Sequence, residues 1–190
     1  MGIAVAETKF AKAVDAAMRA FVSLIDPRLV GTAAYSAAEK NRPEAMRLLH
    51  EMRADLDKPN TDTDTPTGIA AQKGLKAMVQ LLYDLGADVH RSANNGPIHI
   101  AAAAGHDKIV LLLLSLRAAV NAQADRGGTA CLAAAAQGHI RVVTTLLRMR
   151  ADPNLAVEGW TAADAARDQE HDEVLALLMR YGATHNVRRE

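Results

Sequence analysis

The stretch Pro97-Ile98-His99-Ile100-Ala101-Ala102-Ala103-Ala104-Gly105-His106 decides the fold, because closely similar stretches recur along the chain. Residues 65–74 read TPTGIAAQKG, residues 129–139 read TACLAAAAQGH, and weaker copies begin at Thr32 and Thr161. The copies start about 33 residues apart, a period typical of proteins built from stacked structural repeats. The starts lie at Thr32, Thr65, Gly96, Thr129 and Thr161.

Each copy predicts a pair of helices. Threonine is a good N-cap residue and proline suits the first helical turn, so we expect a short alanine-rich helix after each start. Gly74, Gly105 and Gly138 stand where this helix should end, as glycine often does at a helix C-terminus. A second helix then carries closely spaced apolar residues, as in Ile109-Val110 and Leu113-Leu114. Polar turns connect each pair to the next.

This pattern resembles the ankyrin repeat, whose period and T-P-L-H-x-A signature are best matched by Pro97-Ile98-His99-Ile100-Ala101-Ala102. The resemblance implies an all-α ankyrin-repeat solenoid with five repeats in residues 31–185. A helical pattern before Pro27 predicts an N-terminal capping helix and linker in residues 1–30. Residues 186–190 are expected to form a C-terminal tail.

The copies depart from the family pattern at two positions. Alanine replaces the proline at Ala33, Ala130 and Ala162. Other residues replace the histidine: Tyr35, Gly68, Leu132 and Asp164. The first and last copies are the most degenerate, which is expected because terminal repeats present one face to water.

Composition excludes several classes of protein. The net charge is zero, whereas general nucleic-acid binding requires a basic face. The apolar run Ile109 to Leu114 is far too short to cross a membrane, so no membrane insertion is expected. Cys131 is the only cysteine, which favours a reducing compartment, and we interpret it as a small core residue rather than a nucleophile. We therefore expect an intracellular, cytoplasmic protein, with the nucleus as an alternative.

Nothing in the sequence predicts catalysis, so we expect no enzyme activity and no cofactor. There is no G-x-S-x-G, P-loop or H-E-x-x-H motif. His106, His139 and His171 occupy one repeated position, so stacking should place them in a row that does not converge on a single zinc ion. The family resemblance implies that these histidines form hydrogen bonds between units. The polar cluster around Asp168 is interpreted as a solvated turn.

The ankyrin resemblance implies that binding uses the hairpin tips and the exposed side of the first helices, which line a concave groove. The middle of this groove is small and smooth, at Ala103 and Ala104, and Trp160 is either an aromatic anchor or part of the scaffold. Carried over residue by residue, the expected partner-binding positions are Glu39, Lys40, Asp62, Asp64, Gln72, Lys73, Asn95, Asp125, Arg126, Gln137, Glu158, Trp160, Asp168 and Gln169.

Two further columns are unexpected for this family. The residue that closes each second helix is apolar or aromatic, and these residues, here called the apolar column, are Met52, Leu85, Leu116, Met149 and Tyr181. The next position, where the family has glycine in a left-handed turn, holds Arg53, Gly86, Arg117, Arg150 and Gly182. A non-glycine residue there costs on the order of 1 kcal/mol. Either the columns complete local helix caps, or they form a binding ridge for an acidic partner.

We therefore expect a protein–protein interaction module, acting as a scaffold, adaptor or inhibitor, that is monomeric by itself. A rigid, preformed surface lowers the ordering cost of binding. One alternative is a regulatory subunit that acts in trans on a kinase, ubiquitin ligase or phosphatase. Another is a structural spacer without a specific partner.

Overall fold

The computed structural model describes residues 27–60, 64–90, 96–124 and 128–184, with side chains from residue 33 onward. Over these residues the secondary structure is helical, with two isolated β-bridges in the loops. The helices are α2 (Pro27–Glu39), α3 (Pro43–Glu51), α4 (Pro66–Gln72), α5 (Lys76–Asp84), α6 (Pro97–Ala103), α7 (Asp107–Ser115), α8 (Ala130–Ala136), α9 (Ile140–Arg148), α10 (Ala162–Asp168) and α11 (Asp172–Arg180).

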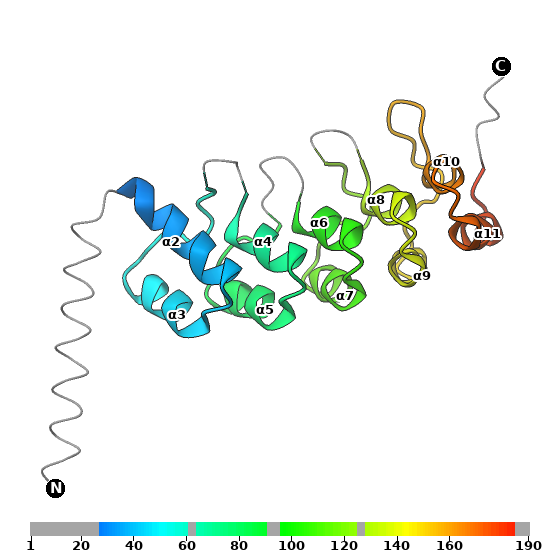
Figure 1. Cartoon of the computed structure of the whole chain (residues 1–190). Helices are drawn as coiled ribbons and strands as arrows, with labels where there is room; N and C mark the ends of the chain where they lie inside the picture. The colour runs from blue at the N-terminus through cyan, green and yellow to red at the C-terminus, as the bar shows by residue number, and fades with distance from the viewer. Residues whose placement is uncertain (1–26, 61–63, 91–95, 125–127, 185–190) are drawn as a thin grey trace, which may run out of the picture.

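The helices form two rows along an elongated stack (Figure 1). The first helices α2, α4, α6, α8 and α10 pack on one another in chain order, and the second helices α3, α5, α7, α9 and α11 do the same. Each first helix also packs on the second helix of its own unit. The loop between α9 and α10, which is described throughout, projects on the side of the first helices (Figure 1). This arrangement confirms the all-α solenoid expected from the repeat.

Three first helices begin at the threonine that the sequence predicts. The side-chain oxygens of Thr65, Thr129 and Thr161 each accept a hydrogen bond from the backbone N–H three residues further on. Thr161 forms a full capping box with Asp164, in which each side chain accepts from the backbone of the other residue. Gly96 begins α6 with an extended backbone but has no side chain to offer.

The first unit differs from the prediction. We expected Thr32 to cap the first helix, but α2 already begins at Pro27 and Thr32 lies inside it. Proline favours this earlier start, because its fixed φ suits the first helical turn. Proline has no N–H, and this costs nothing in the first turn, where an N–H would have no partner within the helix. The expected capping helix before Pro27 lies outside the described residues, so the division at residue 30 stays a proposal.

The turn between the two helices of a unit is left-handed in every unit. The residue at this turn has φ 74° at Gly74, 77° at Gly105 and 71° at Gly138, and also φ 51° at Asn41 and 58° at Glu170. Conformation alone therefore does not require glycine.

A ring from the next unit accounts for the three glycines. A Cβ added to Gly74, Gly105 or Gly138 would lie 2.8 Å from the imidazole of the next unit's histidine, which is His106, His139 and His171 respectively. At Asn41 this requirement is absent, because the next unit has Leu75 at the histidine position. No described unit follows the one that contains Glu170. Glycine occurs in this chain wherever a histidine ring packs on the turn.

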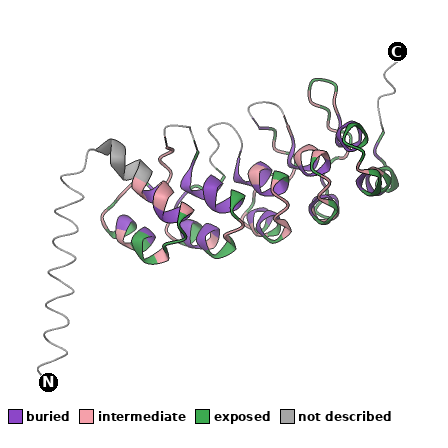
Figure 2. Cartoon of the chain, viewed as in Figure 1, coloured by how far each residue is buried: buried purple, intermediate pink, exposed green. Residues whose placement is uncertain are grey.

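The core runs continuously between the two rows. Large apolar side chains of the second helices are fully buried, among them Met46, Met78, Ile109, Leu146 and Leu178. The first helices contribute alanines with no exposed surface, and these are Ala70, Ala101, Ala134 and Ala166. Figure 2 shows buried residues in every unit of the stack. Small side chains let the first helices approach closely, which explains how a chain with 3% aromatic residues forms a packed interior.

Candidate functional site

A groove crosses the first helices α4, α6 and α8 in the middle of the stack. It has a volume of about 360 Å³ and is lined by Gln72, His99, Ile100, Ala103, Ala104 and Ala133. Ala103 is exposed, Ala104 and Ala133 are half-buried, and Gln72 stands at one edge. The part of the floor formed by the three alanines is small, so backbone can approach it closely there.

Histidines hold the ends of the helices that carry this groove. His106 Nε2 lies 2.9 Å from the carbonyl oxygen of Gln72, and His139 Nε2 lies 2.9 Å from that of Ala103. Because a carbonyl oxygen only accepts, the imidazole donates in both contacts. These bonds tie the last turn of each first helix to the following unit, which confirms the expected structural role of His106 and His139. They also fix the groove residues before any partner binds.

The first-helix ends bring part of the predicted binding set together. Lys73 Nζ lies 3.3 Å from the Glu39 carboxylate and 3.2 Å from the Glu39 carbonyl oxygen, so the first two units are joined at their rim. At the other end of the stack, the Gln169 amide donates to the Asp168 carboxylate at 3.0 Å. The exposed pair Lys73–Glu39 contributes at most about 1 kcal/mol to stability. Both charged side chains remain partly exposed to solvent.

Most of the other predicted positions are exposed. Lys40, Asp64, Gln72, Gln137, Glu158, Asp168 and Gln169 all lie at the surface. Gln137 and Gln169 are the C-cap residues of α8 and α10, at the same point of their units as Lys73. Four predicted positions fall outside the described residues, namely Asp62, Asn95, Asp125 and Arg126.

Trp160 sits at the base of the last hairpin. Its backbone exchanges two hydrogen bonds of 2.9 Å with Val157, and the two residues between them, Glu158 and Gly159, have φ values of 51° and 82°. Two left-handed central residues are typical of a type I′ hairpin turn. The indole is half-buried directly before the N-cap Thr161. This position suits both a scaffold role and a binding role, and the choice between them stays a prediction.

Three lining residues were missed by the sequence reasoning, namely His99, which was interpreted as part of the framework, Ile100 and Ala133. Ile100 is half-buried and lies four residues before Ala104, so both fall on the same face of α6. Ala133 occupies the position in α8 that corresponds to Ile100 plus one repeat. The helical spacing from the predicted Ala104 is the signal that would have found Ile100.

The apolar column is divided by the structure. Leu85 and Leu116 are half-buried against the core, which fits local cap completion. Met149 and Tyr181 are 42% and 41% exposed, and the Arg180 guanidinium carbon lies 5.9 Å from the centre of the Tyr181 ring. The neighbouring arginines have φ values that confirm the left-handed turn, at 59° for Arg53, 73° for Arg117 and 66° for Arg150. Whether the exposed end of the column binds a partner stays a prediction.

Asp164 replaces the family histidine with a buried network. Its carboxylate accepts from the Thr161 hydroxyl at 2.8 Å, from the Thr161 N–H at 3.0 Å and from Arg167 at 2.7 Å. Burial on its own would raise the pKa of Asp164. The hydrogen bonds from Thr161 and the charge and hydrogen bond of Arg167 outweigh that effect and hold the pKa below its ordinary value. The aspartate therefore acts as a charged cap of α10.

The lone thiol has the environment of a core residue, which confirms its interpretation. Cys131 is buried, and burial, with a smaller contribution from the charge of Asp152, raises its pKa to about 12. A thiol of this kind is a poor nucleophile. Within the described ranges, no three His, Cys, Asp or Glu side chains are placed to hold a metal ion. Among the described helices, none combines the length and apolar character needed to span a membrane.

A stack of helix pairs in two rows defines the class of the molecule as a helical-repeat solenoid. Its sequence matches the family model described as "Ankyrin repeats (3 copies)" over residues 3–93 and 98–189. This chain belongs to the ankyrin repeat family. The first match begins at residue 3 and so includes most of the segment assigned to a capping helix.

A curated relative supports the same membership. The chain is 31% identical over 144 residues to the "Ankyrin repeat and KH domain-containing protein mask-1" of Caenorhabditis elegans. The alignment covers 75% of this chain and 5% of that protein, so the chain spans a small part of its relative. Ankyrin repeats are generally protein–protein interaction modules.

Proposed function

We propose that this chain binds a protein partner along the groove formed by α4, α6 and α8. The observation that carries the proposal is the groove of about 360 Å³, which has a floor of small side chains and exposed polar residues at its edge. A floor of alanines excludes no backbone, so a partner helix or loop can lie directly on it. The partner is expected to contact the groove and then the polar rim.

The rim supplies the chemical discrimination in this proposal. At the N-terminal end it carries Lys40 and the Lys73–Glu39 pair, and at the C-terminal end it carries Asp168 and Gln169. A partner with complementary charges at both ends would be fixed in direction along the groove, because electrostatic complementarity sets specificity more than affinity. Asp64, Gln72, Gln137, Glu158 and Trp160 complete the proposed contact surface.

Preorganisation is part of the proposed mechanism. The bonds from His106 to Gln72 and from His139 to Ala103 hold the ends of α4 and α6 in place. A surface that is already ordered loses little conformational freedom on association. The proposal places the protein inside the cell, where its lone buried Cys131 stays reduced.

Affinity capture followed by mass spectrometry would identify the partner, and substitution of an exposed alanine would test the groove. Ala103→Glu places a charged side chain on the floor, whereas Ala77→Glu places the same side chain on an exposed position of α5 in the other row. We expect Ala103→Glu to lower the affinity for the captured protein at least tenfold and Ala77→Glu to leave it unchanged. Equal affinities for the two variants would contradict the proposal.

The same capture distinguishes the alternatives. A captured set dominated by one kinase, ubiquitin ligase or phosphatase would favour regulation in trans. If the wild type and the variants capture the same background proteins and no partner is captured reproducibly, the structural spacer is favoured.

A further inference from the structure

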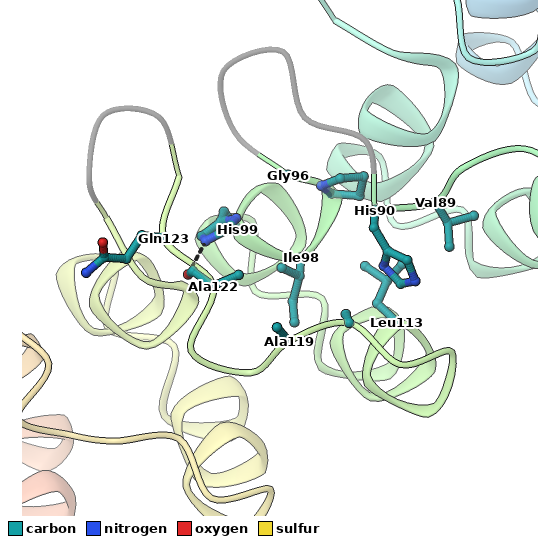
Figure 3. A pocket seen from close by; sticks show the side chains of 11 residues that line it. Val89, His90, Gly96, Ile98, His99, Leu113, Ala119, Ala122 and Gln123 are labelled. Atoms are coloured by element: carbon teal, nitrogen blue, oxygen red, sulfur yellow. Dashed lines mark hydrogen bonds between the residues drawn. The ribbon is translucent and has the colours of Figure 1, made fainter.

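A second cavity, which shares only His99 with the groove, lies between the second and third units. It has a volume of about 140 Å³ and lies below the loops that flank α6 (Figure 3). Its apolar walls come from Val89, Ile98, Leu113, Ala118 and Ala119, and polar groups of His90, His99 and Gln123 also line it. An apolar cavity of about 150 Å³ is large enough to hold a benzene molecule.

One polar atom in this cavity has no partner. His99 is 94% buried, since 6% of its surface is exposed, and its Nε2 lies 2.8 Å from the carbonyl oxygen of Ala122 (Figure 3). Because the carbonyl accepts, Nε2 carries the hydrogen, and Nδ1 of the neutral ring is left as an acceptor. Nδ1 is buried and forms no hydrogen bond with any described residue. A buried acceptor without a donor costs about 1–3 kcal/mol.

The other units of this chain show what is missing next to Nδ1. In the repeat alignment the other four units have threonine at the position of Gly96, and in the last unit the Thr161 hydroxyl donates at 2.8 Å to Asp164, which occupies the position of His99. Gly96 has no hydroxyl, and a Cβ built on it would lie 3.3 Å from His99 Nδ1. The space beside Nδ1 is therefore the space that a threonine side chain fills elsewhere.

Two more departures from the repeat line the same cavity. Ala119 stands where three other units have Asp55, Asp88 and Asp152, each of which accepts a hydrogen bond from the backbone two residues on. His90 stands where the other units have aspartate or asparagine.

This second departure breaks a ladder that joins the other units. Asp57 accepts from the Asp88 N–H and Asn121 accepts from the Asp152 N–H, both at 2.9 Å. His90 instead places Nε2 2.9 Å from the carbonyl oxygen of Leu116. Three departures from the repeat, at Gly96, Ala119 and His90, thus line one cavity.

We propose that this cavity binds an apolar group of about the size of a benzene ring that carries one O–H donor, which hydrogen-bonds to His99 Nδ1. The walls supply apolar contact and the unpartnered acceptor supplies direction, which is the usual composition of a ligand pocket. A phenol ring has this chemistry, and it can come from a free small molecule or from a tyrosine side chain of a partner. Apart from His99, the residues that line this site differ from those that line the groove.

Phenol and toluene test the proposal as matched probes, because they have nearly the same shape and differ in the donor. Binding is followed by the NMR shifts of the Ile98 and Leu113 methyl groups and of His99 Nδ1, with the exposed Ile140 as a remote reference. We expect phenol to shift all three groups and to bind about fivefold more tightly than toluene, the effect of one hydrogen bond. Equal affinities, or no shift with either probe, would overturn the proposal.

Variants test the location. Gly96→Thr puts a hydroxyl and a methyl group into the cavity, and we expect it to abolish phenol binding. Gly128→Thr is the matched control, because a Cβ at Gly128 meets nothing within 4 Å, and it should bind phenol as the wild type does. Ala119→Leu fills the cavity from another wall and should also abolish phenol binding. It provides the test if the Gly96→Thr protein does not fold. Phenol binding that survives both cavity variants would overturn the proposal.

N-acetyl-tyrosine amide distinguishes the two sources of the ligand. If it produces the same shifts as phenol, the cavity is open to a tyrosine presented by a protein. If phenol binds and the tyrosine amide does not, the proposal holds for small molecules alone.

Discussion

Replacing Gly96 with serine is expected to stabilise the protein. Gly96 is the N-cap of α6, with φ −60° and ψ 153°, an extended conformation that serine adopts without strain. At the same point of their units, the hydroxyl oxygens of Thr65 and Thr129 accept a hydrogen bond from the backbone N–H three residues further on, at 3.0 and 3.1 Å. A serine hydroxyl can therefore accept from the His99 N–H and donate to His99 Nδ1.

The size of the effect follows from three contributions. Serine is better than glycine at an N-cap by a few tenths of a kcal/mol. A hydrogen bond to the buried Nδ1 adds about 1 kcal/mol. Loss of glycine's freedom in the unfolded chain adds about 0.4–1 kcal/mol. The new Cβ is close to Nδ1, at 3.3 Å, so the ring must move by a few tenths of an ångström. A net gain of about 1.5 kcal/mol remains, or about 3–6 °C in Tm for a protein of this size.

Thermal and urea unfolding, followed by circular dichroism, measure this gain. Gly96→Ala is the control, because it adds the same Cβ and the same effect on the unfolded chain but no hydroxyl. Serine should be more stable than alanine at this position by about 2 kcal/mol, from the cap and from the bond to Nδ1. Equal stability of the two variants would refute the reasoning. A Gly96→Ser protein less stable than the wild type would show that the His99 ring does not move.

Three further changes have definite expected results. Gly105→Ala should lower the free energy of unfolding by about 2 kcal/mol or more, because its Cβ would lie 2.8 Å from the His139 ring at φ 77°; an unchanged urea midpoint would contradict this. Arg150→Gly should raise the same free energy by about 1 kcal/mol by relieving φ 66°, and a loss would mean that the arginine's interaction with the helix dipole dominates. Asp164 has a pKa below its ordinary 3.8, so its charge stabilises the fold above that value and this contribution is lost as the pH falls toward the folded pKa. Asp164→Asn should therefore have a lower free energy of unfolding than the wild type near neutral pH, and this difference should shrink in strong acid. A difference that stays constant with pH would show that the charge of Asp164 does not stabilise the fold.

The repeat could be predicted from sequence because the residues that the fold requires recur at the same position in several units. Thr65, Thr129 and Thr161 follow from cap chemistry, and the left-handed arginines follow from alignment with glycine in other units. The start of α2 could not be predicted in this way, because the repeat alignment places the start of this unit at Thr32. A proline that opens a helix five residues earlier is a local signal that the repeat alignment overrides.

The cavity beside His99 shows a different limit. Gly96, His90 and Ala119 each differ in sequence from the equivalent residues of most other units, but they are separated along the chain and lie in different segments. Their convergence depends on how the loop after α5 and the loop after α7 flank α6. A comparison of the repeats shows each of these three substitutions separately. Only the packing of the helices and loops shows that the three residues line the same cavity.

The contacts between each turn glycine and the histidine of the next unit determine at which residues the repeats of this protein can be recombined. A segment that runs from one threonine to the next carries its own glycine but takes the matching ring from its neighbour. If such a segment is grafted below a unit with leucine at the histidine position, its glycine is left without a ring. If a histidine unit is placed above Asn41 or Glu170, the ring meets a side chain. The exchangeable module in this chain therefore extends from a glycine to the histidine of the following unit, and a recombined chain should be built in that phase.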